Sequence, residues 1–147
     1  MREFFLCMCA VVLMGLVACT TPIPSTESIV PTPLPQPNPG KATVIGIVVS
    51  SSNKPIPQAP VWLAEVVRQG NGGIYVLDSA ASPGAYTDEN GIFVILNVNP
   101  GEYVIVVGAP ESWYEIIAEP SGKAKVWNIS PDQIVNLGKI QVATWKK

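Results

Sequence analysis

The chain has 147 residues, of which 14% are charged, and its formal net charge is −2. This length is typical of one domain with appended segments, and the sparse charge argues against a nucleic-acid partner, which would need clustered Lys and Arg. Histidine is absent, which removes the commonest general base and metal ligand and favours a protein that is not an enzyme and holds no metal or cofactor. All three cysteines lie within the first nineteen residues, so the body has no disulfide framework.

The N-terminus is typical of a secretion signal. Residues 4–18 form an uncharged apolar run, which is short for a membrane span. The run ends in Leu16-Val17-Ala18-Cys19, which resembles the processing motif of bacterial lipoproteins. The resemblance implies that residues 1–18 are removed as a signal peptide and that Cys19 is acylated, which would anchor the chain to a membrane. An ordinary cleaved signal or an uncleaved helical anchor would leave Cys19 unmodified.

The same resemblance implies a location. We expect the protein outside the cytoplasm, in the bacterial cell envelope. Thr20 stands directly after Cys19, where an aspartate is associated with retention in the inner membrane. In a bacterium with two membranes we therefore expect the outer one.

Residues 19–42 are expected to be the lipidated cysteine followed by a disordered linker. The segment 20–40 holds seven of the fifteen prolines, which favour extended backbone and cannot donate ladder hydrogen bonds. At about 3.1 Å per residue it could hold a domain about 60 Å from its anchor. An alternative is that it serves as a proline-rich ligand for a recognition module.

The body, residues 43–147, reads as short apolar strands separated by Gly, Pro and Asn turns. About seven strands of this kind predict an antiparallel β-sandwich. The segments 116–119 and 124–129 are expected to pair with each other, although the sequence leaves 110–119 ambiguous between helix and strand. The segments from which the strands are expected are 42–49, 61–67, 74–77, 92–96, 103–107, 116–119, 124–129 and 134–142.

The centre of the body is predicted to be a hairpin. Residues 88–91 supply a turn, because short polar side chains bond their own backbone and Gly91 accepts a positive φ. The strand 92–96 follows, and a second turn at 99–101 leads to the strand 103–107. We expect Tyr103 to bond its phenol to a nearby backbone group.

This arrangement resembles the carboxypeptidase regulatory-like domain, a transthyretin-like (prealbumin-type) sandwich. The resemblance is carried by residues 44–48, 55–63, 87–103 and 134–140. It implies a seven-stranded antiparallel transthyretin-like or Ig-like sandwich that serves cell-surface proteins as an accessory or spacer domain, without the zinc peptidase found beside it in some of them. The matching positions, which we interpret as structural, are Gly46, Asp88, Asn90, Gly91, Phe93, Pro100, Gly101 and Tyr103.

Three aromatic residues, Trp113, Tyr114 and Trp127, are candidates for ligand binding, because flat rings stack on sugar rings. The alternative is that they fill gaps in the core. Exposure of both Trp113 and Tyr114 would favour binding, and burial of both would exclude it. We therefore expect a non-enzymatic, lipid-anchored structural or interaction module, with a cell-surface glycan or protein as its candidate partner. The alternative function is a carbohydrate- or peptide-binding accessory lipoprotein that uses the aromatics of residues 109–124.

Three weaker hypotheses remain open. Oxygen ligands could hold calcium at residues 88–90, although turn chemistry explains the same side chains. Related surface sandwiches carry an isopeptide crosslink between a lysine and an asparagine or aspartate, promoted by a buried glutamate. Separately, paired carboxylates can act as the acid and the base of an enzyme. The candidate residues are Lys41, Glu65 and Asn136 for the crosslink, and Glu115 and Glu119 for catalysis.

Overall fold

The computed structural model describes residues 33–70, 72–143 and 145; the expected signal peptide and Cys19 lie outside these residues. The described residues form nine strands and no helix. No helix among them is long and apolar enough to cross a membrane. The strands are β1 (Ala42–Ser50), β2 (Pro60–Gln69), β3 (Gly72–Val76), β4 (Gly84–Tyr86), β5 (Ile92–Val98), β6 (Gly101–Gly108), β7 (Tyr114–Ile116), β8 (Val126–Ile129) and β9 (Ile134–Val142).

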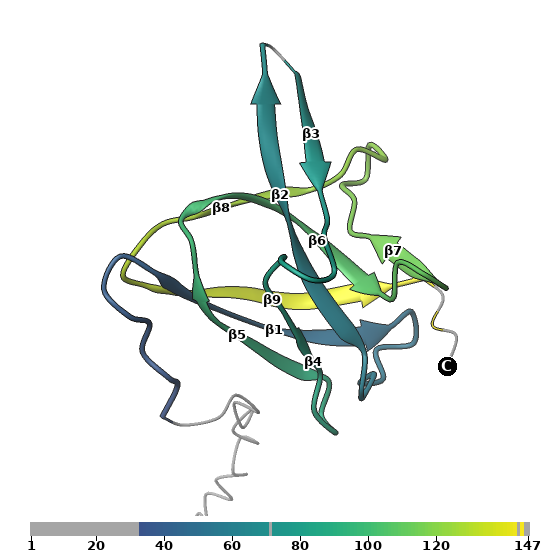
Figure 1. Cartoon of the computed structure of the whole chain (residues 1–147). Coiled ribbons are helices and arrows are strands. Elements are labelled where there is room, and N and C mark those ends of the chain that lie inside the picture. Colours follow the sequence, from purple (N-terminus) through teal and green to yellow (C-terminus); the bar gives the residue numbers. More distant parts are fainter. Residues whose placement is uncertain (1–32, 71, 144, 146–147) are drawn as a thin grey trace, which may run out of the picture.

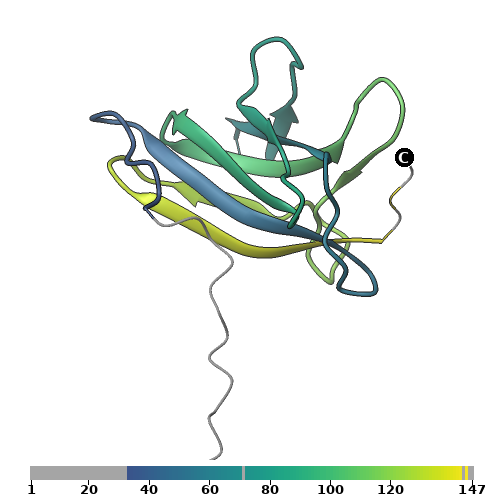
Figure 2. The same cartoon turned by 90° about the horizontal axis from the view of Figure 1, so that it is seen from below.

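The strands form two sheets that lie over one another (Figures 1 and 2). The smaller sheet has the order β5-β1-β9, and the larger one β3-β2-β6-β7, with β4 pairing with β2 and β8 with β6. The predicted all-β class is thus confirmed. Two details of the prediction differ from the structure. The described residues form nine strands rather than about seven, and β4, which has only three residues, corresponds to none of the expected segments. Strand β1 also runs parallel to β9, whereas an antiparallel sandwich was expected.

The main core fills the space between the two sheets. Alternating residues of the strands point into it, so that Phe93 of β5 and Leu63 and Ile105 of the larger sheet are almost fully buried. Among the described residues, the members of this core, and of a second cluster described below, lie between Ala42 and Trp145. A chain that begins at Thr20 therefore keeps both of these clusters.

The predicted central hairpin is wrong. Strand β5 pairs with β1 in the smaller sheet, whereas β6 pairs with β2 in the larger one. The short segment Asn99–Pro100 between them carries the chain from one sheet to the other. Phe93, Tyr103 and Ile105 nevertheless face the shared core as expected, because alternation along a strand does not depend on which strand is its neighbour.

The predicted pairing of the segments 116–119 and 124–129 is also wrong, apart from a single bridge between Ala118 and Ala124. Strand β7 pairs with the end of β6, from Val106 to Gly108, and β8 pairs with its beginning. The two segments thus lie one after the other along the same edge of β6.

The turn at residues 88–91 is formed as predicted. The Asp88 Oδ1 atom accepts hydrogen bonds from the backbone N–H of Asn90 at 2.9 Å and of Ile92 at 2.8 Å. Gly91 has a φ of 74°, and a Cβ atom there would lie 2.5 Å from the carbonyl oxygen of Val48. Next to the turn, the buried Thr87 hydroxyl donates to the carbonyl of Ile56 and accepts from the N–H of Ala59.

The predicted hydrogen bond of Tyr103 is also confirmed, and Gly46 has a clear structural role. The Tyr103 phenol donates a 3.0 Å hydrogen bond to the carbonyl of Asn99. A Cβ atom on Gly46 would lie 2.7 Å from Cζ of Phe93 and 3.2 Å from the Gly138 carbonyl oxygen, so both neighbouring strands crowd this position. Gly101 has no comparable restriction; it begins β6 with ordinary contacts to the Tyr103 ring.

The chain just before β1 is bonded to one end of the sandwich, which we call the junction (residues 35–41). The N–H of Asn38 donates to Oδ1 of Asn97 at 2.9 Å, and the N–H of Gly40 donates to Oδ1 of Asp132 at 2.6 Å. Asn97 has a φ of 55° at a bulge in β5, and this local conformation places its side chain against the junction. The first residue of the junction is also held, because the Thr43 hydroxyl of β1 donates to the Pro35 carbonyl.

Candidate functional site

The three candidate aromatic residues do not form one platform. Trp113 packs against the main core and meets Trp145 edge to face, with ring centroids 5.5 Å apart. Trp127 also packs against this core, and Nζ of Lys125 lies 4.8 Å from its ring centroid. Tyr114 is 48% exposed. The comparison of Trp113 with Tyr114 therefore gives a divided result. Trp113 packs against the core, which argues against binding, whereas Tyr114 faces solvent, which leaves binding open.

Tyr114 lines a cavity of about 240 Å³ on the outer face of the larger sheet, the face turned away from the smaller sheet. We call this cavity the outer groove. Tyr75 and Leu77 come from β3 and the residues directly after it, whereas Pro110 and Ile116 come from the β6–β7 region. The residues that line the outer groove are Tyr75, Leu77, Val106, Pro110, Tyr114 and Ile116.

The floor of the outer groove belongs to a second apolar cluster. Strand β6 is buried on both faces, so that Tyr103, Ile105 and Val107 enter the main core while Val104 and Val106 point outward. Together with Ala64 of β2, these two valines form the buried part of the second cluster, and Trp62, Val66, Leu77, Ile116 and Ala124 pack against it. The outer face is therefore apolar over several strands, which is unusual for a sheet face without a covering layer.

A tight return after β6 places Tyr114 at the groove. Gly108 has a φ of 114°, and a Cβ atom there would lie 2.3 Å from the carbonyl oxygen of Trp113. Only glycine lets the two backbone segments approach so closely. The indole N–H of Trp62 donates to the Gly108 carbonyl at 3.1 Å and supports this return from the neighbouring strand.

Part of the groove was not predicted from the sequence. Tyr75 and Leu77 lie two residues apart in the predicted strand 74–77, so their common face could have been predicted. Their meeting with Tyr114 could not, because β3 and β7 are separated in the sheet by β2 and β6. Tyr114 is thus the only groove residue that was predicted as a site residue. Sequence reasoning missed the other five residues that line the groove, which are Tyr75, Leu77, Val106, Pro110 and Ile116.

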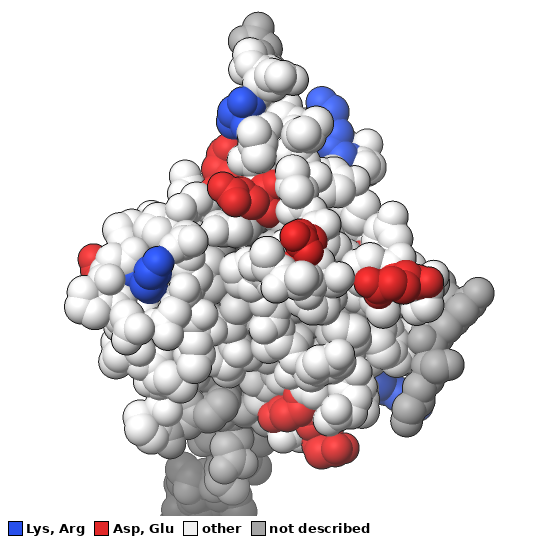
Figure 3. Space-filling view, in the orientation of Figure 1, with Lys and Arg blue, Asp and Glu red and all other residues white. Residues whose placement is uncertain are grey.

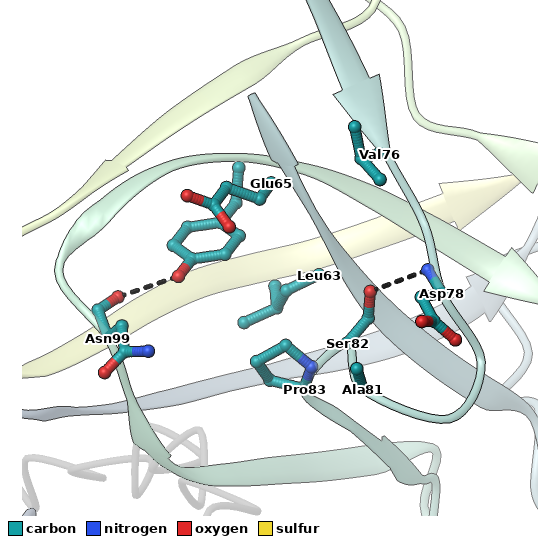
Figure 4. A pocket seen from close by; sticks show the side chains of 9 residues that line it. Leu63, Glu65, Val76, Asp78, Ala81, Ser82, Pro83 and Asn99 are labelled. Atoms are coloured by element: carbon teal, nitrogen blue, oxygen red, sulfur yellow. Dashed lines mark hydrogen bonds between the residues drawn. The ribbon is translucent and has the colours of Figure 1, made fainter. Parts of the chain in front are cut away.

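A second, more polar hollow lies where the loop between β3 and β4 approaches the beginning of β6 (Figure 4). Its polar groups are largely used in local structure. The Ser82 hydroxyl accepts from the N–H of Asp78, and Oδ1 of Asp78 accepts from the N–H of Ala80, each at 2.9 Å. Burial, and then the negative charge of Glu65, raise the pKa of Tyr103 above its ordinary value. These contacts indicate a braced loop rather than a reactive centre.

No charged residue lines the outer groove, whereas Glu65 and Asp78 line the second hollow. Acidic side chains gather below the projecting end of β2 and β3, and most of the same face is uncharged (Figure 3). The described residues contain no group of three or more His, Cys, Asp or Glu side chains that could hold a metal. The bonds of Asp88 described above also confirm turn chemistry as the explanation for residues 88–90.

The remaining candidate residues make separate structural contacts. Lys41 donates to Oδ1 of Asn99, and Oδ1 of Asn136 accepts from the N–H of Gly138, so these two crosslink candidates bond to other groups. The Glu115 carboxylate accepts from the N–H of Ala143 at 2.9 and 3.1 Å, which ties β7 to the residue after β9. Glu119 is exposed in the loop between β7 and β8.

No protein-family model matches this sequence, and the search of curated proteins gave no match. Among solved structures, a 9R-lipoxygenase from Cyanothece PCC8801 is similar, with 16% sequence identity and a TM-score of 0.44. The match covers 72% of this chain but only 17% of the lipoxygenase chain. The major pilin subunit of Bacillus cereus is 20% identical with a TM-score of 0.43 over 70% of this chain, which spans 30% of the pilin chain.

A putative carbohydrate-binding protein from Pseudomonas aeruginosa is also similar in structure. It is 20% identical with a TM-score of 0.42, and the match covers 70% of this chain and 91% of that one. Likenesses of this degree carry no argument about activity, so the function must be argued from the residues described above.

Proposed function

We propose that this protein is a lipid-anchored component of the bacterial cell envelope, and that its β-sandwich acts as a non-enzymatic structural or interaction module of the carboxypeptidase regulatory-like, transthyretin-like kind. The anchor would be the acylated Cys19, and residues 20–34 would form the stalk. In a bacterium with two membranes, the outer membrane is the proposed location.

The observation that carries this proposal is the junction. A linker that only connects two independent parts needs no fixed contact with the body. Here, the side chains of Asn97 and Asp132 accept hydrogen bonds from the backbone of residues 38 and 40, and Thr43 holds the Pro35 carbonyl. These bonds hold residues 35–41 against the body, which supports the proposal of a module that is presented from a surface in one orientation.

The anchor is tested by replacing Cys19 with alanine. The wild-type protein, extracted from membranes of the producing bacterium, is expected to begin at Cys19 and to carry added acyl mass. The Cys19→Ala variant is expected to lack this mass and to leave the membrane fraction, because the acyl chains supply the membrane affinity. Intact-mass measurement and fractionation check both results, and Thr20→Ala serves as the matched control. A wild-type protein with an unmodified Cys19, or with residues 1–18 retained, would contradict the proposal.

A second candidate function is favoured by the exposure of Tyr114 in the outer groove. The rings of Tyr75 and Tyr114 offer flat faces, their hydroxyls can bond with sugar hydroxyls, and Val106 and Ile116 supply apolar surface between them. This combination fits the pyranose ring of a glycan, which has one apolar face and a polar rim.

The glycan hypothesis is tested with Tyr114→Ala and cellohexaose as the probe. Loss of the ring contact, about 1 kcal/mol, is expected to weaken binding about fivefold. Isothermal titration calorimetry measures the change. Tyr86→Ala is the control, because Tyr86 is 66% exposed on β4 and does not line the groove. Equal affinity of both variants, or no binding by the wild-type protein, would contradict this use of the groove while leaving the anchored module untouched.

A further inference from the structure

The end of β2 and strand β3 form a two-stranded arm, residues 65–69 and 72–76, which projects from the body (Figure 1). All five residues of β3 are exposed. On β2, Arg68 donates two hydrogen bonds to the Glu102 carboxylate, at 2.6 and 2.8 Å, and these bonds lower the pKa of Glu102. Because this ion pair joins the arm to β6, it favours one direction of the arm relative to the body.

Strand β3 has a free edge. In the described part of the chain it pairs with β2 alone. The register runs from Gln69↔Gly72 to Glu65↔Val76, and two residues of the sequence separate the closing pair. In such a hairpin the closing pair is hydrogen-bonded and the pairs then alternate. Gly73 and Tyr75 therefore direct their N–H and C=O groups away from β2.

This edge lacks the usual protection against pairing. Edge strands are normally blunted by charge, proline or a covering segment. The sequence of β3 is Gly-Gly-Ile-Tyr-Val, with neither a charge nor a proline. Its side chains are well exposed, at 61% for Ile74, 45% for Tyr75 and 46% for Val76, and Val67 opposite Ile74 is 47% exposed. The arm thus combines a free backbone edge with apolar side chains on both of its faces.

We propose that β3 is the interface of a homodimer, in which it pairs antiparallel with β3 of a second copy about a twofold axis at Ile74. The sequence is complementary to itself in this register. Ile74 faces Ile74 of the second copy, and each Tyr75 lies opposite a Gly73. The outward backbone groups of Gly73 and Tyr75 meet their counterparts, so two residue pairs each exchange two hydrogen bonds.

Side-chain size supports the same register. Tyr75 of one copy lies opposite Gly73 of the other copy, and this glycine has no side chain. The tyrosine ring therefore has room to lie across the strand of the second copy. The two Ile74 residues form a non-hydrogen-bonded pair, in which side chains approach most closely. The dimer would join the two larger sheets into one continuous sheet. Because β3 is short, we expect a weak, reversible dimer in solution.

The register is tested by disulfide formation in a chain that begins at Thr20. This chain contains both described core clusters and no native cysteine. The Ile74→Cys variant is expected to form a disulfide-linked dimer under mild oxidation, because symmetry brings the two sulfur atoms together. In the Val76→Cys variant the two cysteines would lie about 13 Å apart along the strands, so it should form no disulfide-linked dimer. Leu96→Cys, 50% exposed on β5, is the control for random collision.

A second measurement does not depend on oxidation. Sedimentation velocity of the wild-type chain at rising concentration is expected to show reversible dimers. Ile74→Lys should abolish them, because two lysines would face each other, whereas Leu96→Lys should leave them unchanged. A wild-type chain that stays monomeric would overturn the proposal, as would equal crosslinking of the Ile74→Cys and Leu96→Cys variants. Crosslinking through residue 76 instead of residue 74 would overturn the register.

Discussion

Replacing Gly91 with alanine is expected to destabilise the fold by about 3 kcal/mol, the sum of backbone strain and a displaced neighbouring strand. Gly91 has a φ of 74°, which costs an L-residue about 1–2 kcal/mol. The new Cβ atom would also lie 2.5 Å from the Val48 carbonyl oxygen. That oxygen belongs to β1, and the Val48 N–H donates to the Gly91 carbonyl at 2.8 Å, so neither backbone can move without disturbing the other.

The matched control for this prediction is Gly122→Ala. Gly122 has a φ of 82°, but no atom lies within 4 Å of the position that its Cβ would take. This variant should therefore lose only the strain of the left-handed conformation, about 1–2 kcal/mol. Urea unfolding of both variants, analysed with the same slope, gives the two free energies of unfolding. Equal losses would show that the contact with Val48 contributes nothing.

Replacing Phe93 with alanine is expected to cost about 3–5 kcal/mol of stability, the range for a large aromatic residue removed from a core. Phe93 is 1% exposed and lies between the two sheets. Leu96→Ala on the same strand is the control. Leu96 is 50% exposed, and we expect its replacement to change the free energy of unfolding by about 0.5 kcal/mol or less. Thermal or urea unfolding measures both variants.

The contact between Phe93 and Gly46 makes the same prediction more specific. Gly46→Ala alone should destabilise, because its Cβ atom would lie 2.7 Å from the Phe93 ring. In a Phe93→Ala background the clash with the ring is gone and only the 3.2 Å approach to the Gly138 carbonyl oxygen remains. The double variant should therefore lose less stability than the sum of the losses of the two single variants. Additive losses would contradict the assignment of this close contact.

The parts of the fold that depend on residues close together in the sequence could be predicted. The turn at Asp88 and the strand β9 follow from local turn chemistry and from apolar runs. The pairing of β5 with β6 was predicted wrongly, because a short turn at Asn99 and Pro100 has the same composition whether it closes a hairpin or crosses between sheets. The difference is decided by contacts of β5 with β1 and of β6 with β2, which lie far apart in the sequence.

The candidate site shows the same limit. The sequence places Trp113 and Tyr114 side by side but does not say which of them faces the core, because that depends on how the chain returns after Gly108. The burial of Trp113 is decided by its contact with Trp145 and the main core. The outer groove requires Tyr75 as well, and its position relative to Tyr114 is set by the twist and order of four strands.

The parallel pairing of β1 and β9 has a mechanical consequence. Ala42 begins β1 at the same end of the sandwich as Ile134 begins β9, so the first residue of β1 and the last residue of β9 lie at opposite ends of one ladder. Tension applied between the chain before Ala42 and the chain after Val142 would load these hydrogen bonds in shear, all together, rather than opening them one after another. Because β1 is also bonded to β5 on its other side, the strand that receives the pull is held along both edges.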